Sequence, residues 1–215
     1  MSNLTNKNIL LCVTGGIAAY KAAELVRLLK TSNAFVKVLM TKSAQEFITP
    51  LTMQALSGEK VHTDLLSTEA EAAMGHIELA KWCDLIVIAP CSANSLSKIA
   101  EGRGDDLLSA VCLATESKIF IAPAMNQAMW KDKRTQKNLS KSIKAGLNII
   151  GPASGEQACG DVGDGRMTEP ADIVSEVEKT LEKGLLTGKK VIITAGPTQE
   201  TVSYTHLRAH ETGWY

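Results

Sequence analysis

Short, largely apolar runs recur along the chain, separated by longer stretches of mixed character. They lie at residues 8–13, 34–40, 84–90, 118–125 and 147–152. Runs of this length without strict polar alternation are typical of parallel strands whose two faces are both buried. The pattern therefore predicts five strands.

The stretches between these runs carry apolar residues at helical spacing. Residues 17–32 predict one helix, and residues 43–58 predict a second helix that breaks near Pro50. Residues 169–185 predict a terminal helix with Pro170 in its first turn, where proline is favoured. Strands that alternate with helices predict an α/β fold, a Rossmann-like (flavodoxin-like) parallel sheet with helices on both faces.

The same pattern suggests where the domain ends. After Leu186 it restarts, because residues 187–200 read as a new strand followed by a glycine turn. Residues 201–215 show no periodicity, and we expect them to be a non-native tail. The predicted organisation is one domain over 1–186, the start of a truncated second domain over 187–200, and the tail.

Composition narrows the classes of partner. The 23 basic and 23 acidic side chains give a formal net charge of zero, which does not favour nucleic acid or an anionic membrane as partner. No apolar run approaches the roughly 18 residues that a membrane span needs, and the first residues lack the apolar core of a signal peptide. We expect a cytoplasmic protein. The five cysteines form no CxxC pair and no zinc-like spacing with histidine, so neither a disulfide framework nor a metal site is expected.

Polar and glycine residues follow several predicted strands. In a parallel sheet these positions gather at one edge, where ligands of such folds bind. "TGGIAAYK" (14–21) joins the first strand to a helix and could form a cofactor loop or only a tight turn. It lacks the GxGxxG pattern of dinucleotide sites. "TKS" (41–43) and "PCSAN" (90–94) could cap helices or bind an anion.

Three further residues are candidates for chemistry. His76 is isolated in sequence, and such histidines are more often surface or core residues than catalysts. Asn126 directly follows a strand, where its amide could cap a helix or hold a substrate carboxylate or amide. Cys159 lies in residues 154–170, a stretch too broken for a helix and too glycine-rich for a strand, which suggests a flap with or without a reactive thiol.

Together these strings resemble one family. "TGGIAAYK", "GHIELA", "PCSAN", "PAMNQAMW" and "ACGDVGDGRM" occur in the order seen in the flavin-dependent cysteine decarboxylases, and the resemblance covers residues 5–186. It is greatest to the members that convert 4′-phosphopantothenoylcysteine to 4′-phosphopantetheine in coenzyme A biosynthesis. "GKKVIITAGPTQE" resembles the start of the ligase domain fused to bacterial members.

The resemblance implies a set of site residues and a homo-oligomer. His76 and Cys159 would be catalytic, and Asn126 would bind the carboxylate end of the substrate. The FMN site would form between protomers of a homotrimer, which often assembles into a dodecamer, with His76 reaching a neighbour's flavin. The residues implied to hold FMN are Gly15, Gly16, Ile17, Thr41, Lys42, Ser43, Ser92, Ala93, Asn94, Ser95 and Ala124.

The family chemistry explains these residue types. Loss of CO2 from an unactivated cysteinyl carboxylate leaves a carbanion that no side chain can stabilise, so a cofactor must accept electrons first. The resemblance implies oxidation of the thiol-bearing carbon, decarboxylation to an ene-thiolate, and reduction to the thiol with a proton from Cys159. The alternatives are a peptidyl-cysteine decarboxylase, which stops at the ene-thiol and generally lacks the flap cysteine, and a non-catalytic flavin-binding regulator. A flavin prenyltransferase would have no use for "PAMNQAMW".

Overall fold

The structure is a computed structural model that describes residues 2–65, 75–158 and 160–181. These residues belong to one compact unit, which ends at Glu182. The predicted boundary at residue 186, the second domain and the tail lie outside the described residues and stay predictions. So does everything predicted for Cys159 itself.

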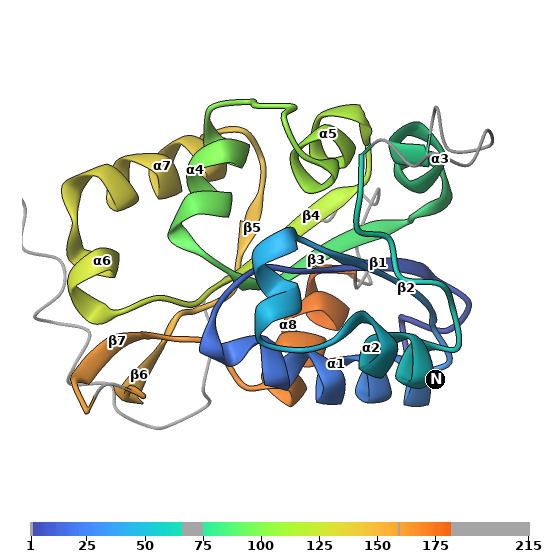
Figure 1. Ribbon diagram of the computed structural model, residues 1–215, viewed down its shortest axis with the longest axis horizontal. Helices are drawn as coiled ribbons and strands as arrows, with labels where there is room; N and C mark the ends of the chain where they lie inside the picture. Colours follow the sequence, from blue (N-terminus) through green and yellow to red (C-terminus); the bar gives the residue numbers. More distant parts are fainter. Residues whose placement is uncertain (1, 66–74, 159, 182–215) are drawn as a thin grey trace, which may run out of the picture. The chain divides into compact units, whose positions relative to one another are not determined.

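A five-stranded parallel sheet forms the centre of this unit (Figure 1). All five predicted strands are present, and their order in the sheet is β2-β1-β3-β4-β5. The order reverses between β1 and β3, which makes the carboxyl ends of these two strands the place where a ligand-binding crevice opens. The strands are β1 (Asn8–Val13), β2 (Phe35–Met40), β3 (Leu85–Cys91), β4 (Lys118–Pro123) and β5 (Asn148–Ile149).

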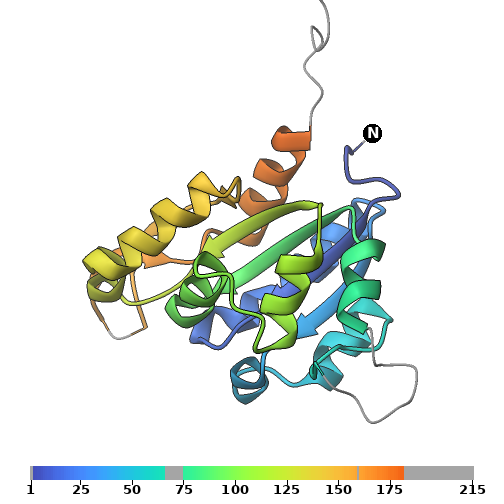
Figure 2. The ribbon, with the colours of Figure 1, turned by 90° about the horizontal axis from the view of Figure 1, so that it is seen from above.

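Helices cover both faces of the sheet, as predicted (Figures 1 and 2). One apolar cluster joins the sheet to α1, α2 and α8, and a second joins it to α3, α4 and α5. Among the described helices, none is long and apolar enough to cross a membrane. The helices are α1 (Tyr20–Thr31), α2 (Pro50–Ser57), α3 (Gly75–Trp82), α4 (Ala93–Ala100), α5 (Leu107–Ala114), α6 (Gln127–Lys131), α7 (Lys133–Lys144) and α8 (Pro170–Leu181), with short 3-10 turns η1 (Ile17–Ala19) and η2 (Lys42–Glu46).

Alternate residues of each central strand serve the two faces. In β1, Ile9 and Leu11 enter the first cluster, whereas Leu10 and Cys12 enter the second, because successive side chains of a strand point to opposite faces. All four residues are fully buried. This explains why the strand reads as an uninterrupted apolar run.

The glycine-rich stretch after β5 was expected to be neither helix nor strand, and this expectation was wrong. β6 (Ala153–Glu156) and β7 (Val162–Arg166) pair as an antiparallel hairpin. Low β-propensity was outweighed by the backbone pairing and by a close approach that only glycine allows. A Cβ atom at Gly165 would lie within 2.3 Å of the Met125 carbonyl oxygen.

Candidate functional site

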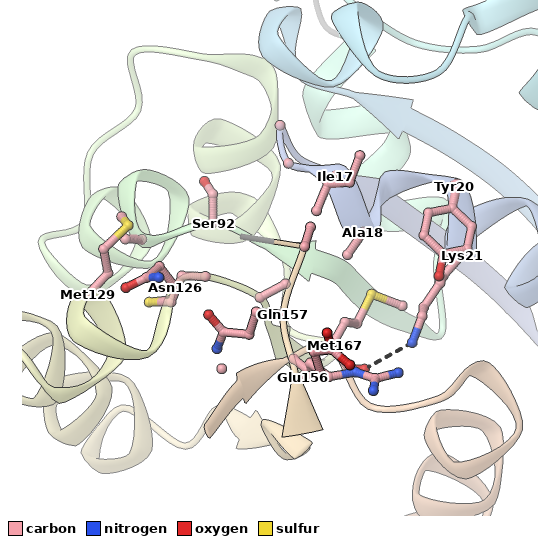
Figure 3. A pocket seen from close by; sticks show the side chains of 18 residues that line it. Ile17, Ala18, Tyr20, Lys21, Ser92, Asn126, Met129, Glu156, Gln157 and Met167 are labelled. Atoms are coloured by element: carbon pink, nitrogen blue, oxygen red, sulfur yellow. Dashed lines mark hydrogen bonds between the residues drawn. The ribbon is translucent and has the colours of Figure 1, made fainter. Parts of the chain in front are cut away.

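A cavity of about 670 Å³ opens at the carboxyl ends of β1, β3 and β4, and the β6–β7 hairpin forms one of its walls (Figure 3). Asn126 and Met129 lie at one end of it, and Tyr20 and Lys21 lie at the other. Of the predicted residues it is lined by Gly15, Gly16, Ile17, Ser92, Ala93, Ala124 and Asn126.

A second cavity of about 540 Å³ adjoins the first, since both are lined by Gly15, Ser92, Ala93 and Met129. It contains the predicted residues of the β2 and β3 ends, namely Thr41, Lys42, Ser43, Asn94 and Ser95. The fold thus brings every predicted cofactor residue to one of two adjoining cavities at the crossover of the sheet.

Thr14 holds the β1 and β3 ends together. Its buried hydroxyl donates to the Pro90 carbonyl oxygen at 2.8 Å and accepts a hydrogen bond from the Ser92 amide at 2.9 Å. Sequence reasoning placed Thr14 in a strand-end loop but gave it no role. The sequence feature that could have indicated this role is the position of Thr14, a polar residue directly after an apolar strand.

Gly15 is needed for a close approach between two loops. A Cβ atom on it would lie 2.5 Å from the Cβ atom of Ser43, whereas a Cβ atom on Gly16 would meet nothing within 4 Å. The two glycines of "TGG" therefore differ. Gly15 allows the chain to pack, whereas Gly16 is half-buried and has open space beside it at the cavity.

The polar strand-end residues cap helices, which was the simpler of the two interpretations. The Thr41 side chain accepts from the Ala44 amide, Ser92 from the Ser95 amide, and Asn126 from the Ala128 amide. Capping does not exclude a ligand, because the first amides of a helix remain without intrahelical partners. Both interpretations remain compatible with the structure.

The charged side chain of Lys98 lines the second cavity, and two carboxylates balance its positive charge. The Nζ atom of Lys98 donates to Asp105 at 2.9 Å and to Asp106 at 2.8 Å, and the bonds to Asp106 and Asp105 raise the pKa of Lys98. Partial burial opposes ionisation of Asp106, but hydrogen bonds from Lys98 and Ser109 outweigh it and lower its pKa. This cluster was not predicted, since it depends on how α4 meets the start of α5.

A buried cation, Lys21, lines the first cavity. The Nζ atom of Lys21 lies 2.6 Å from a Glu169 carboxylate oxygen, and it also donates to the Met167 carbonyl oxygen at 3.4 Å (Figure 3). The bond from Lys21, reinforced by Arg166, lowers the pKa of Glu169. The Lys21 side chain is only 8% exposed, so Glu169 provides the countercharge that such burial requires.

The hairpin is tied to the start of α6 by several hydrogen bonds. The Asn126 side-chain amide donates to an Asp161 carboxylate oxygen at 2.9 Å, and the Gln127 backbone amide donates to the Gln157 side chain at 3.1 Å. Ala158, in the hairpin loop, lines the first cavity. Asn126 therefore lies in the cavity wall beneath the predicted flap.

His76 is not brought to this site. It lies at the start of α3, half-buried, and it lines neither cavity. Its Nδ1 atom is buried and has no hydrogen-bond partner among the described residues. Within the described part of the chain, no cluster of three or more His, Cys, Asp or Glu side chains is arranged to hold a metal ion.

The parallel sheet has polar residues at its β1–β3 crossover and a largely apolar cavity beside the β6–β7 hairpin, which is where ligands of such folds bind. The family model described as Flavoprotein matches residues 1–182, and the chain belongs to this family.

The chain is also similar to curated proteins of coenzyme A biosynthesis. The chain is 52% identical over 214 residues to the coenzyme A biosynthesis bifunctional protein CoaBC of Vibrio cholerae, which covers 99% of this chain and 54% of that protein. The chain thus spans about half the length of the curated relatives it matches. The fold is similar to that of a mutant PPC decarboxylase complexed with pantothenoylaminoethenethiol, with a TM-score of 0.73, 34% identity, and coverage of 83% of this chain and 100% of that one. It is also similar to the FMN binding protein AtHal3, with a TM-score of 0.69, 35% identity, and coverage of 81% and 96%.

Proposed function

We propose that this chain is an FMN-dependent carboxy-lyase that converts 4′-phosphopantothenoylcysteine to 4′-phosphopantetheine in coenzyme A biosynthesis, in the cytoplasm. The observation that carries the proposal is the pair of adjoining cavities at the β1–β3 crossover, which bring together the predicted cofactor residues, Asn126 and the hairpin. The similarity to a PPC decarboxylase along that protein's whole length supports the same assignment.

The residues present suit a flavin mononucleotide. The cavity-lining backbone of Gly16 and a wall of alanine and methionine offer an apolar surface for a ring system. Hydroxyl groups at the capped helix starts offer donors for a phosphate. Bound FMN would supply the two-electron acceptor that no side chain provides. The residues proposed to hold it are those of 15–17, 41–43, 92–95 and Ala124.

Asn126 would orient the substrate. Its side-chain oxygen accepts from the Ala128 amide at 2.8 Å, so its nitrogen is the atom directed to a carboxylate. A neutral amide can hold a carboxylate without the full positive charge that would oppose loss of CO2. The hairpin above it would exclude water, and Cys159 would donate the last proton.

A second copy of the chain would complete the site. His76 lines neither cavity, while Ile17 and Tyr20 beside the first cavity are 64% and 62% exposed. Apolar side chains this exposed are suited to a contact between protein chains. We therefore propose a homotrimer, or a dodecamer built from it, in which His76 serves a neighbouring site.

The test uses the purified full chain with FMN and no added oxidant. We expect yellow protein that releases CO2 from 4′-phosphopantothenoylcysteine and forms 4′-phosphopantetheine, identified by mass spectrometry. Cys159→Ser should instead accumulate the oxidised, decarboxylated ene-thiol, whereas Cys112→Ser, which changes a thiol packed against the core, should form normal product. Protein that cannot be loaded with FMN would refute the proposal. Normal product from Cys159→Ser would remove only the role of the thiol.

A further inference from the structure

The side-chain amide of Asn126 is already hydrogen-bonded to a carboxylate of the protein itself. The Nδ2 atom of Asn126 donates to an Asp161 carboxylate oxygen at 2.9 Å, across 35 residues of sequence. Two other bonds hold the hairpin to the same segment, from the Gln127 amide to Gln157 and from the Met125 amide to the Gly165 carbonyl oxygen at 2.9 Å. The bond to Asp161 is therefore one of several hydrogen bonds between the hairpin and this segment, and the other two do not involve its carboxylate.

The chemistry of this contact matches that of the substrate. Since the side-chain oxygen of Asn126 caps α6, its nitrogen is the part of the amide that meets a carboxylate, and Asp161 now provides one. A substrate carboxylate placed on the same nitrogen would meet the negative charge of Asp161. Two carboxylates this close repel each other, so the second one displaces the first.

The exposed position of the contact makes such an exchange feasible. Asp161 lies on the surface and the bond is solvent-exposed, so the released carboxylate regains water at little cost. The bond that breaks and the bond that forms are of one kind, an amide N–H to a carboxylate. Their free energies are therefore similar, and small differences decide which carboxylate is bound.

We propose that Asp161 is a positioning and specificity-determining residue that holds the place of the substrate carboxylate on Asn126. This inference rests on the proposed function. A ligand with a carboxylate displaces Asp161, and the product, which has lost that group as CO2, lets Asp161 return. The contact thus counteracts binding of the substrate in its ground state and leaves binding of the product untouched.

The experiment compares two ligands that differ only in the carboxylate. They are 4′-phosphopantothenoylserine and its ethanolamine counterpart, in which a hydroxyl replaces the thiol so that no oxidation begins. Calorimetry on the FMN-loaded full chain measures both dissociation constants for the wild type, Asp161→Ala, Asp161→Asn and Asp164→Ala. Asp164 is an exposed carboxylate of the same hairpin and controls for net charge.

We expect Asp161→Ala to bind the serine ligand about fivefold more tightly, or about 1 kcal/mol, while the ethanolamine ligand changes less than about twofold. Asp161→Asn should change the ratio in the same direction by less, and Asp164→Ala should leave both constants unchanged. An equal loss of affinity for both ligands would show that Asp161 only supports the hairpin. An unchanged ratio would also overturn the inference. Failure of both ligands to bind the wild type would refute the proposed function, and the role of Asp161 with it.

Discussion

The two adjacent glycines after β1 allow a sharp test of the cofactor site. A methyl group at Gly15 would lie 2.5 Å from the Ser43 Cβ atom and 3.1 Å from the Ser43 carbonyl carbon and oxygen. A methyl group at Gly16 would meet nothing within 4 Å, and the φ angle of 161° at Gly16 is extended backbone that any residue adopts. The same substitution, glycine to alanine, therefore has different consequences one residue apart.

The magnitudes follow from these contacts. Optimal separation of two carbon atoms is about 3.5–4.0 Å, so alanine at position 15 forces the β1 and β2 loops apart. Overpacking of this kind costs about 1–3 kcal/mol. Alanine at position 16 removes freedom from the unfolded chain at no steric cost, which stabilises proteins by about 0.4–1 kcal/mol.

Binding of FMN should separate the variants in another way. Gly16→Ala places a methyl group beside the cavity, where we expect the flavin to contact the backbone, so its affinity for FMN should fall by about tenfold, or about 1.4 kcal/mol. Gly15→Ala should lose both stability and FMN affinity. The assays are urea unfolding of the FMN-free protein and titration of FMN followed by its fluorescence.

Two outcomes would refute the reasoning. Wild-type FMN affinity in Gly16→Ala would mean that the flavin does not approach this backbone. A wild-type free energy of unfolding in Gly15→Ala would mean that the loops at Gly15 and Ser43 adapt without cost. The FMN titration of Gly16→Ala therefore tests the flavin contact, and the urea unfolding of Gly15→Ala tests the packing of the two loops.

Two further predictions concern stability and thiol chemistry. Asp106→Ala should lower the free energy of unfolding by about 1–2 kcal/mol at pH 7, since it removes the cap of α5 and the partner of Lys98. Because the folded-state pKa of Asp106 is lowered, its contribution is present above the unfolded value of about 3.9 and is lost as pH falls through the folded value, so the difference between wild type and variant in urea unfolding should shrink below about pH 4. Burial raises the pKa values of Cys12 and Cys91, so at pH 8 an aromatic disulfide reagent should label them only after denaturation. Rapid labelling of Cys91 in the native protein, mapped by mass spectrometry, would contradict its burial.

The elements with strong periodicity could be predicted from the sequence. The apolar runs of β1 and β3 are buried on both faces, and such a strand requires apolar residues at every position. The break in the second predicted helix near Pro50 could also be predicted from the local sequence. The 3-10 turn η2 ends at Glu46, and α2 begins at Pro50. The helix α5 was not predicted, because its short apolar sequence between Leu107 and Ala114 could as well be a strand.

The residues that tie elements together could not be predicted in this way. Thr14, Lys98 and Asp161 act through partners that lie 7 to 78 residues away, and their roles depend on distances that no local pattern contains. The hairpin of β6 and β7 likewise depends on backbone pairing and on the closeness of Gly165 to Met125.

The sequence by itself determined the five strands of the central sheet, the strongly periodic helices and the candidate residues at the strand ends. Burial of a strand on two faces and helical spacing of apolar residues are both visible in the local sequence. The tertiary structure decided how those ends meet. It made glycine necessary for packing at position 15 and left open space at Gly16. It also paired Lys21 and Lys98 with carboxylates and brought Asp161 to Asn126. These outcomes depend on the order of strands in the sheet, which sets the neighbours of each loop, and a one-dimensional pattern specifies the loops but not their neighbours.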